Sequence, residues 1–273
     1  MPDQVAVPGT GGTQAGLPIP VFVINMERDE ARRRHMTESL AQLGLAAEFA
    51  PAVDGRQGLA PQHRAAYDRA KALRVYGVEM WDTEIACFLS HRNLHARMVA
   101  EGIEAALILE DDVHMEPALP GVVRGLLAHP FQDWLVVRLD SKRTQLHEPP
   151  SPRYRGTPVA ALDGGGTLFR LGTHVLGTGA YLIKREGAAR MLAYSRRIFM
   201  PIDHTMDRFW ANGIQPYVVR PFPVLQRHDF GSSTGVSKPS RRGGQPAGRR
   251  LARRAQRVLD GLHKRAFLLM RGG

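Results

Sequence analysis

Short apolar runs, each followed by apolar residues at helical spacing, predict strands followed by helices. The run 20–25 is short, apolar and β-branched, which is typical of a buried strand. Residues 27–43 then carry apolar side chains at helical spacing, and Gly44 is the expected helix stop. We therefore expect the folded part of the chain to begin near Leu17.

The same order recurs further along the chain. A helix is predicted over 83–101, with Thr83 as its N-cap, and it leads into an apolar strand at 105–109. Further strands are expected at 134–139, 175–183 and 216–219, and further helices at 185–194 and 201–212. Strands that alternate with helices favour an α/β domain, with a mixed, mostly parallel sheet covered on both faces.

Segments without this periodicity set the expected boundaries. Residues 1–17 are rich in glycine, proline and threonine, which indicates a flexible leader. Residues 145–166 are rich in proline and glycine, and we expect a long mobile loop of the kind that covers active sites. The folded domain is expected over 18–237, followed by a basic tail over 238–273.

The positive charge lies almost entirely in that tail. The net charge is +11, and residues 238–273 hold eleven basic residues against Asp260, which is +10. Within 249–270, apolar residues recur at helical spacing among arginines and lysines, which predicts a basic amphipathic helix. Such a helix suits an anionic membrane surface, and we expect that contact rather than one with nucleic acid because apolar residues share the segment.

The remaining composition indicates a cytoplasmic protein. Cys87 is the only cysteine, so no intrachain disulfide can form and nothing indicates an oxidising compartment. The start does not show the pattern of a secretory signal, and no apolar run approaches the ~18 residues of a membrane-spanning helix. We expect a location in the cytoplasm, peripheral on the inner face of the plasma membrane if the tail binds it.

Three consecutive carboxylates, Glu110, Asp111 and Asp112, follow directly on the strand predicted at 105–109. Ligands of open α/β sheets bind at the carboxyl ends of strands, so this position favours a site. Adjacent carboxylates repel one another unless a cation neutralises them, and Mg²⁺ or Mn²⁺ bound there would hold a diphosphate. The alternative is a solvated turn with one helix-capping aspartate.

The helix predicted over 83–101 carries further polar candidates. Glu84, His91 and His95 lie along one of its faces, where two histidines can hold a metal but are more often ordinary polar residues. Ser90 and His91 are sequence neighbours, a poor geometry for a nucleophile and its base, and no G-x-S-x-G elbow is present. Serine hydrolase chemistry is therefore not expected.

Two later segments have structural interpretations beside functional ones. Asp203 opens the helix predicted at 201–212, where a carboxylate is favoured by the helix dipole alone. Gly177 and Gly179 lack the full G-x-G-x-x-G pattern of dinucleotide folds, and glycines here more simply allow close approach of the backbone.

Taken in order, several segments resemble one family. They are V-F-V-I-N at 21–25 followed by Arg28 and Arg32, A-V-D-G at 52–55, E-I-A-C-F-L-S-H at 84–91, L-I-L-E-D-D-V at 107–113, G-T-G-A-Y-L-I at 177–183, P-I-D at 201–203 and L-Q at 225–226. This order resembles the bacterial lipopolysaccharide glycosyltransferases of family 25, whose relatives include collagen galactosyltransferases. The family block G-E-x-x-C-x-x-S-H has Thr83 in place of its glycine.

The resemblance implies a GT-A-like nucleotide-sugar-binding fold and a hexosyltransferase. Galactose or glucose would pass from a UDP-sugar to a saccharide acceptor, in lipopolysaccharide or other cell-surface glycan synthesis. The implied metal ligands are Asp112, Asp111 and His228, and the implied nucleotide-sugar contacts are Asn25, Arg28, Glu110, Asp111, Ser90, His91 and Gln226. Asp112 and Asp203 are the implied catalytic residues, with Asp203 binding the acceptor or taking its proton.

Two other classes stay open. A metal-dependent phosphohydrolase or nuclease would use Asp111 and Asp112 with histidines, but it requires more ligands at metal-binding spacing than the sequence shows. A non-catalytic protein that binds a membrane or nucleic acid would act through the tail, and its function would survive Asp112→Asn.

Overall fold

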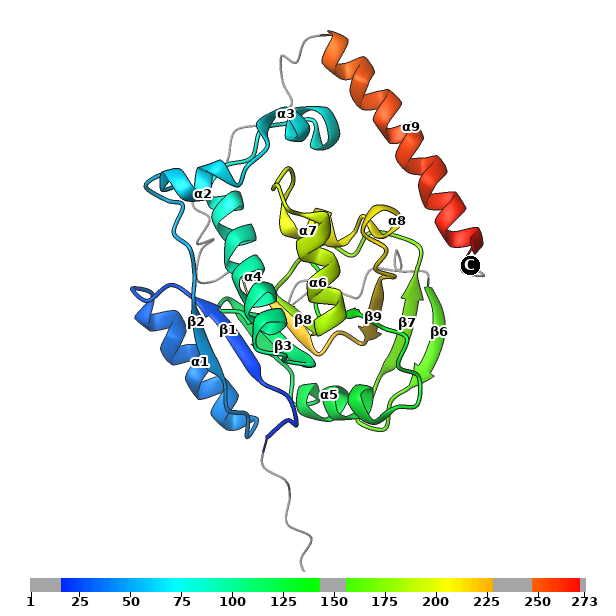
Figure 1. Ribbon diagram of the computed structural model, residues 1–273. Helices are drawn as coiled ribbons and strands as arrows, with labels where there is room; N and C mark the ends of the chain where they lie inside the picture. The colour runs from blue at the N-terminus through cyan, green and yellow to red at the C-terminus, as the bar shows by residue number, and fades with distance from the viewer. Residues whose placement is uncertain (1–15, 143–155, 228–246, 271–273) are drawn as a thin grey trace, which may run out of the picture.

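A computed structural model describes residues 16–142, 156–227 and 247–270. A central eight-stranded sheet is flanked by helices (Figure 1). Its strands are β1 (Val21–Asn25), β2 (Glu48–Pro51), β3 (Ala105–Glu110), β5 (Val136–Arg138), β6 (Gly156–Ala161), β7 (Thr167–Leu171), β8 (Ala180–Lys184) and β9 (Tyr217–Arg220). Strands β4 (Val113–Met115) and β10 (Val224–Gln226) form a separate antiparallel pair.

The helices agree well with the longer periodic segments. They are α1 (Glu30–Gln42), α2 (Pro61–Ala65), α3 (Arg69–Lys71), the π-helix η1 (Ala72–Tyr76), α4 (Asp82–Ala100), α5 (Leu119–Ala128), α6 (Arg185–Tyr194), α7 (Ile202–Met206), α8 (Phe209–Asn212) and α9 (Ala247–Met270). Two details of the prediction are wrong. The helix predicted at 201–212 is two short helices, and the N-cap of α4 is Trp81, whose backbone N–H donates to the Glu84 carboxylate at 2.8 Å.

Alternate residues of each central strand pack on opposite faces of the sheet. Val21 and Val23 of β1 belong to the core beneath α1 and α5, whereas Phe22 and Ile24 belong to the core beneath α4 and α6. Side chains of a strand point alternately to either face, so a strand covered on both sides is apolar throughout, as β1 is. The expected α/β sheet with helices on both faces is confirmed.

The prediction of a mostly parallel sheet is wrong at the level of strand pairing. The order is β2-β1-β3-β8-β5-β9-β7-β6, and four of its seven pairings are antiparallel. The reason is that β8 and β7 run against the other strands, and β8 lies between β3 and β5. Apolar periodicity identifies a buried strand but does not give its direction.

The long loop expected at 145–166 is also partly wrong. Residues 156–161 form strand β6, which pairs antiparallel with β7 at the edge of the sheet. Pro158 is tolerated because an edge strand leaves one side of its backbone unpaired. The first part of the predicted loop, 145–155, lies outside the described residues, as does most of the predicted leader.

Helix α9 packs across one side of the domain, against η1 and α8 (Figure 1). Arg208 donates two hydrogen bonds of 2.7 Å to the Asp260 carboxylate, and the rings of Phe209 and Phe267 meet edge to face at 5.4 Å. These contacts fix one face of α9 on the domain. Among the described residues, no helix combines the length and apolar character needed to cross a membrane.

Candidate functional site

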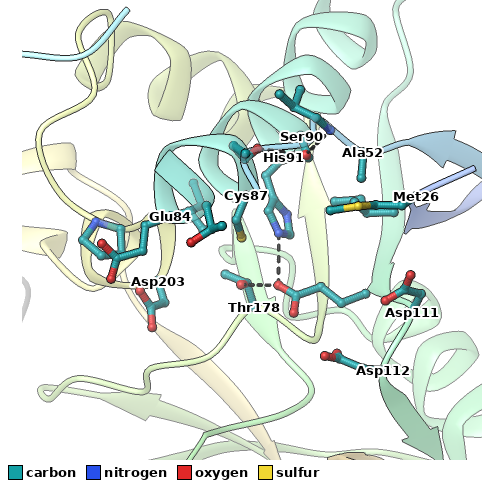
Figure 2. A pocket seen from close by; sticks show the side chains of 18 of the residues that line it. Met26, Ala52, Glu84, Cys87, Ser90, His91, Asp111, Asp112, Thr178 and Asp203 are labelled. Atoms are coloured by element: carbon teal, nitrogen blue, oxygen red, sulfur yellow. Dashed lines mark hydrogen bonds and ion pairs between the residues drawn. The ribbon is translucent and has the colours of Figure 1, made fainter. Parts of the chain in front are cut away.

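A cavity of about 380 Å³ opens at one edge of the central sheet (Figure 2). Strands β1, β3 and β5 end at this edge and β8 begins there, because β8 runs against the other three. This is where α/β sheets bind ligands. The wall includes Met26, Glu84, Cys87, Ser90, His91, Glu110, Asp111, Asp112, Lys142, Thr178, Asp203 and Gln226.

At the acidic end of the cavity, Asp111 is fully engaged whereas Asp112 is not. Asp111 accepts a hydrogen bond from the Asn25 amide and another from the Arg32 guanidinium, both at 2.8 Å. Arg32 is almost completely buried and also lies 3.4 Å from Asp112 Oδ2. Asp112 Oδ1 is buried and has no hydrogen-bond partner. A buried carboxylate oxygen without a partner is costly, so this position is suited to a positively charged ligand.

Burial and mutual repulsion act on these carboxylates. Burial, together with the negative charge of Glu110, raises the pKa of Asp112 to about 7. Burial also raises the pKa of Asp111 above its ordinary value, despite the hydrogen bond from Arg32. The protein alone therefore does not fully stabilise the negative charge at this end of the cavity.

Glu110 is held by a buried chain of hydrogen bonds. His91 Nε2 lies 3.2 Å from Glu110 Oε1, and the Thr178 hydroxyl donates to the same oxygen at 2.5 Å (Figure 2). Burial works to raise the pKa of Glu110, but these hydrogen bonds hold it below the ordinary value, so the carboxylate is ionised. His91 Nε2 is then the donor of its contact with Glu110.

The chain continues into the core through Tyr181. Its hydroxyl lies 2.9 Å from His91 Nδ1 and 3.0 Å from His95 Nε2. With the proton of His91 on Nε2, the tyrosine hydroxyl donates to His91 Nδ1 and accepts from His95. Burial and the neighbouring His91 lower the pKa of His95 to about 3, so His95 is neutral and supports this chain rather than binding a metal.

Thr178 is presented to Glu110 by a loop whose glycines are required. A Cβ on Gly179 would lie 2.7 Å from Asp140 Oδ2, and one on Gly177 would lie 2.8 Å from the Lys142 backbone nitrogen. Asp140 accepts hydrogen bonds of 3.1 Å from the N–H groups of Gly179 and Ala180. The expectation that these glycines allow close backbone approach is confirmed.

The loop also stores backbone strain next to the cavity. Leu176 has φ of 60°, in the left-handed region that side chains other than glycine rarely adopt. Its N–H donates to the buried Asp207 carboxylate at 2.8 Å, which also accepts from the N–H of Val175. Strain of about 1–3 kcal/mol persists only where the surroundings enforce the conformation, as Asp207 does here.

At the other end of the cavity, Asp203 pairs with Lys142. The Lys142 ammonium lies 3.3 Å from Asp203 Oδ2, and the N–H of His204 donates to Oδ1 at 2.8 Å. Burial opposes the ionised carboxylate, but the charge of Lys142 prevails and lowers the pKa of Asp203 to about 2. Asp203 is therefore a hydrogen-bond acceptor that is ionised at neutral pH, and a weak base.

The structure brings most of the predicted site residues to this one cavity. Ser90 lines it and ties the 52–55 segment to α4, since its hydroxyl accepts from Val53 N–H and donates to the Ala86 carbonyl, both at 2.9 Å. Gln226 reaches the acidic end because β10 pairs with β4, which places it opposite Val113. Arg28 does not line the cavity: it is about half exposed and pairs with Asp54. His228 lies outside the described residues.

The sequence alone assigned no role to three residues of this site. Lys142 was not identified and Thr178 was only part of the segment 177–183, although Lys142 follows the end of β5 and Thr178 precedes the start of β8 at the ligand-binding edge, which is the signal that points to them. Arg32 was noted only as part of a resemblance, because its role depends on burial that its place in a charged helix segment does not reveal.

Two arrangements near the cavity have metal-binding chemistry. Among the described residues, Cys87, His91 and Glu110 place one ligand atom each within 4.8 Å of one another. Burial raises the pKa of the Cys87 thiol well above its usual range, and thiol ligands suit softer ions than Mg²⁺ or Mn²⁺. Those two ions prefer oxygen ligands, and the unpartnered Asp112 Oδ1 is of that kind.

Comparisons with known proteins point to one family. The model of glycosyltransferase family 25 (LPS biosynthesis protein) matches residues 18–206, which contain most of the cavity wall. A glycosyltransferase 25 family member of Aedes aegypti is 33% identical over 177 residues, covering 63% of this chain and 27% of the relative.

Procollagen galactosyltransferase 1 of Danio rerio is 26% identical over 233 residues, and a probable inactive glycosyltransferase 25 family member 3 of Bos taurus is 25% identical over 245 residues. Each match covers 80% of this chain and 38% of the relative. The chain thus spans well under half the length of these relatives. Because the family model matches more than half of the chain, the chain belongs to glycosyltransferase family 25.

Proposed function

We propose that this protein transfers a hexose, galactose or glucose, from a UDP-sugar to a saccharide acceptor in lipopolysaccharide or other cell-surface glycan synthesis. The observation that carries the proposal is the unpartnered, buried Asp112 Oδ1 among three carboxylates at the ligand-binding edge of the sheet. Family membership and the name of the galactosyltransferase relative support it. The fold expected with this activity is the GT-A type.

A divalent ion, Mn²⁺ or Mg²⁺, is part of the proposal. Asp112 would hold it through Oδ1, and it would supply positive charge to the diphosphate that departs from the donor. Asp111 already accepts from Asn25 and Arg32, so its part is to orient and support Asp112 unless these bonds rearrange. His228 stays a prediction as a further ligand.

The remaining cavity residues would bind and orient the donor. Glu110, fixed by His91 and Thr178, is placed to accept hydrogen bonds from sugar hydroxyls. Ser90 maintains the cavity wall, and Gln226 offers an amide beside the acidic cluster. Asn25 holds Asp111 from below the wall, whereas Arg28 would contact only a part of the nucleotide that extends over the rim.

In the proposed reaction an acceptor hydroxyl oxygen attacks the anomeric carbon of the donor sugar. A new C–O bond forms, the bond from that carbon to the diphosphate oxygen breaks, and UDP leaves with the electron pair. The hydroxyl proton passes to a carboxylate or to solvent. Because the pKa of Asp203 is about 2, its stronger contribution is to orient the hydroxyl by accepting its hydrogen bond.

We also propose that α9 holds the protein on an anionic membrane surface at the cytoplasmic face. Its exposed side carries large apolar residues, among them Val258 (63% exposed), Leu262 (54%) and Leu269 (81%). The exposed Arg254 and Arg265 flank this stripe. Apolar residues flanked by cations are what an interfacial helix requires, and such a surface would bring the protein to a lipid-linked acceptor.

The test of the activity uses purified protein and a panel of nucleotide sugars, with and without Mn²⁺. We expect release of UDP from one UDP-hexose, dependent on the metal and reduced at least about 10²-fold in Asp112→Asn. The matched control is Asp133→Asn, an exposed aspartate far from the cavity wall. Equal turnover in Asp112→Asn would exclude the proposed role of Asp112.

The same panel separates the alternatives. A phosphohydrolase would release inorganic phosphate from UDP, or UMP and a sugar 1-phosphate from a UDP-sugar, instead of intact UDP. A non-catalytic protein would turn over nothing and bind no donor, a result to be checked by calorimetry because some relatives carry the word inactive in their names.

A further inference from the structure

A second cavity of about 340 Å³ lies between α9 and the body of the domain. Its walls come from η1, from α7 and α8, and from the face of α9 that packs inward. The residues that define its chemistry are Tyr76, His204, Trp210, Arg257, Asp260 and Lys264. Neither the family resemblance nor the comparisons assign any role to it.

This second cavity adjoins the cavity at the sheet edge. Tyr76 and His204 line both cavities, and their rings are 5.3 Å apart. His204 follows Asp203 in the sequence, and its backbone N–H donates to the Asp203 carboxylate. A molecule in the second cavity therefore lies next to the end of the sheet-edge cavity that contains Asp203. This is the residue proposed to orient the acceptor hydroxyl.

Two of the cations in the second cavity are available for a ligand. Arg208 is neutralised by Asp260 through two hydrogen bonds of 2.7 Å, so its role is to hold α9 in place. Within the described part of the chain, neither Arg257 nor Lys264 has a carboxylate partner within 4.0 Å. With Asp260 already paired, the cavity has an excess of positive charge and suits an anion.

The remaining wall is aromatic. Trp210 meets the His174 ring edge to face at 5.7 Å, and its indole N–H is buried without a hydrogen-bond partner. Tyr76 supplies a second ring at the junction with the donor cavity. Aromatic rings offer flat apolar faces to the C–H faces of sugars, and a few polar groups then fix the orientation of the ligand.

We propose that the second cavity is the acceptor subsite and that it takes an anionic saccharide, one that carries a phosphate or carboxylate group. Arg257 and Lys264 bind the anionic group, Trp210 and Tyr76 pack against the sugar ring, and the attacking hydroxyl points past His204 toward Asp203. This deepens the proposed function, because it rests on the sheet-edge cavity being the donor site and names the class of acceptor.

The first experiment measures binding of simple probes to the full chain by isothermal titration calorimetry. The probes are glucose 6-phosphate, glucuronic acid, glucose and inorganic phosphate. We expect both anionic sugars to bind at least about tenfold more tightly than glucose, and more tightly than inorganic phosphate. The preference between the two anionic sugars identifies the anionic group, whereas affinities of both anionic sugars that are no higher than that of glucose would overturn the proposal.

Charge variants locate the site. Arg257→Gln and Lys264→Gln are each expected to weaken glucose 6-phosphate binding about tenfold. The control is Arg254→Gln, an exposed arginine of the same helix that does not line the cavity. If the control weakens binding as much as the two cavity variants do, the effect is one of general tail charge and the site assignment is wrong.

A steric variant tests the cavity itself. Gly261 lines it, and nothing lies within 4 Å of a Cβ built there, so Gly261→Trp places a large ring at the cavity without a clash at its Cβ. We expect it to abolish binding of anionic sugars, while Ala266→Trp, on the exposed face of the same helix, leaves that binding intact. Unchanged binding in Gly261→Trp would exclude this cavity as the subsite.

Calorimetric measurement of UDP binding to the same variants separates the two proposals. We expect Gly261→Trp to bind UDP as the wild type does, since Gly261 is not part of the donor cavity wall. If the wild type binds no UDP, the proposed donor site fails, whereas the sugar titrations still decide for or against the second cavity as an anionic-saccharide site.

Discussion

The carboxylates at the two ends of the sheet-edge cavity differ in their hydrogen-bond partners and in their pKa values. At one end both oxygens of Asp203 have partners, from Lys142 and from backbone N–H groups, and the pKa of the carboxyl is about 2. At the other end Asp112 has an oxygen without a partner, and its pKa is about 7. Both side chains lie in the wall of one cavity.

The difference separates charge that the fold has already stabilised from charge that awaits a ligand. A satisfied carboxylate contributes to stability, and its loss is felt in the free energy of unfolding. An unsatisfied one costs stability, so it persists where binding or catalysis requires it. Asp111, which accepts hydrogen bonds from Asn25 and Arg32, is followed directly by Asp112, which has an oxygen without a partner. A partnered and an unpartnered carboxylate are thus neighbours in the sequence.

The largest effect is expected from Arg32→Met. It leaves the buried Asp111 carboxylate without its cation, and breaking a buried pair from one side costs about 3–5 kcal/mol. Chemical denaturation at neutral pH measures the free energy of unfolding, with the exposed Arg34→Met as control. Adding Asp111→Asn should restore part of the loss, and no greater loss than in the control would show that the pair is not structural.

A smaller effect with a distinct pH dependence is expected from Asp203→Asn. The folded-state pKa of about 2 lies below the ordinary 3.8, so the group stabilises the fold by roughly 2–3 kcal/mol at neutral pH. Because the fold lowers the pKa of this acid, its contribution to stability is present above about pH 4 and is lost as the pH falls through about 2. Unfolding curves of wild type and variant should therefore converge on acidification, and a constant gap would contradict the assignment.

Tyr181→Phe is expected to cost about 1–2 kcal/mol of unfolding free energy. It removes the hydroxyl between His91 and His95 and leaves two buried ring nitrogens without a partner. Because Glu110 is fixed through His91, UDP-sugar affinity should fall together with stability. A fully stable variant would mean that the histidines find other partners.

The smallest effect on stability is expected from Leu262→Glu, within about 0.5 kcal/mol, because more than half of the side chain is exposed. The same change should abolish co-sedimentation with vesicles that contain anionic lipid. Zwitterionic vesicles serve as the reference surface. Retained binding to anionic vesicles would show that the apolar stripe of α9 is not the contact.

Strong periodicity made the central part of the fold predictable. Strands β1 and β3 and helices α1, α4 and α6 lie within a few residues of the predicted ranges, because long apolar patterns leave few alternatives. Strand β6 was missed since glycine and proline dominate its surroundings, and its edge position lets it form despite Pro158. The direction of β8 depends on which strands it pairs with, which local sequence does not contain.

The acidic end of the site was predictable and the opposite end only in part. Glu110, Asp111 and Asp112 are adjacent in sequence and follow one strand, so their grouping could be seen directly. The Lys142–Asp203 pair joins residues 61 positions apart, and the contact of Thr178 with Glu110 joins residues 68 apart. Only the tertiary fold brings these groups together.

The second cavity owes one wall to a helix outside the segment shared with the family. The family match ends at residue 206, whereas α9 spans Ala247–Met270. Substitutions in that helix can reshape what the cavity accepts without touching the carboxylates at the sheet edge. If the second cavity takes the acceptor as proposed, exchange of this one C-terminal helix would change the acceptor while the proposed donor site stayed the same.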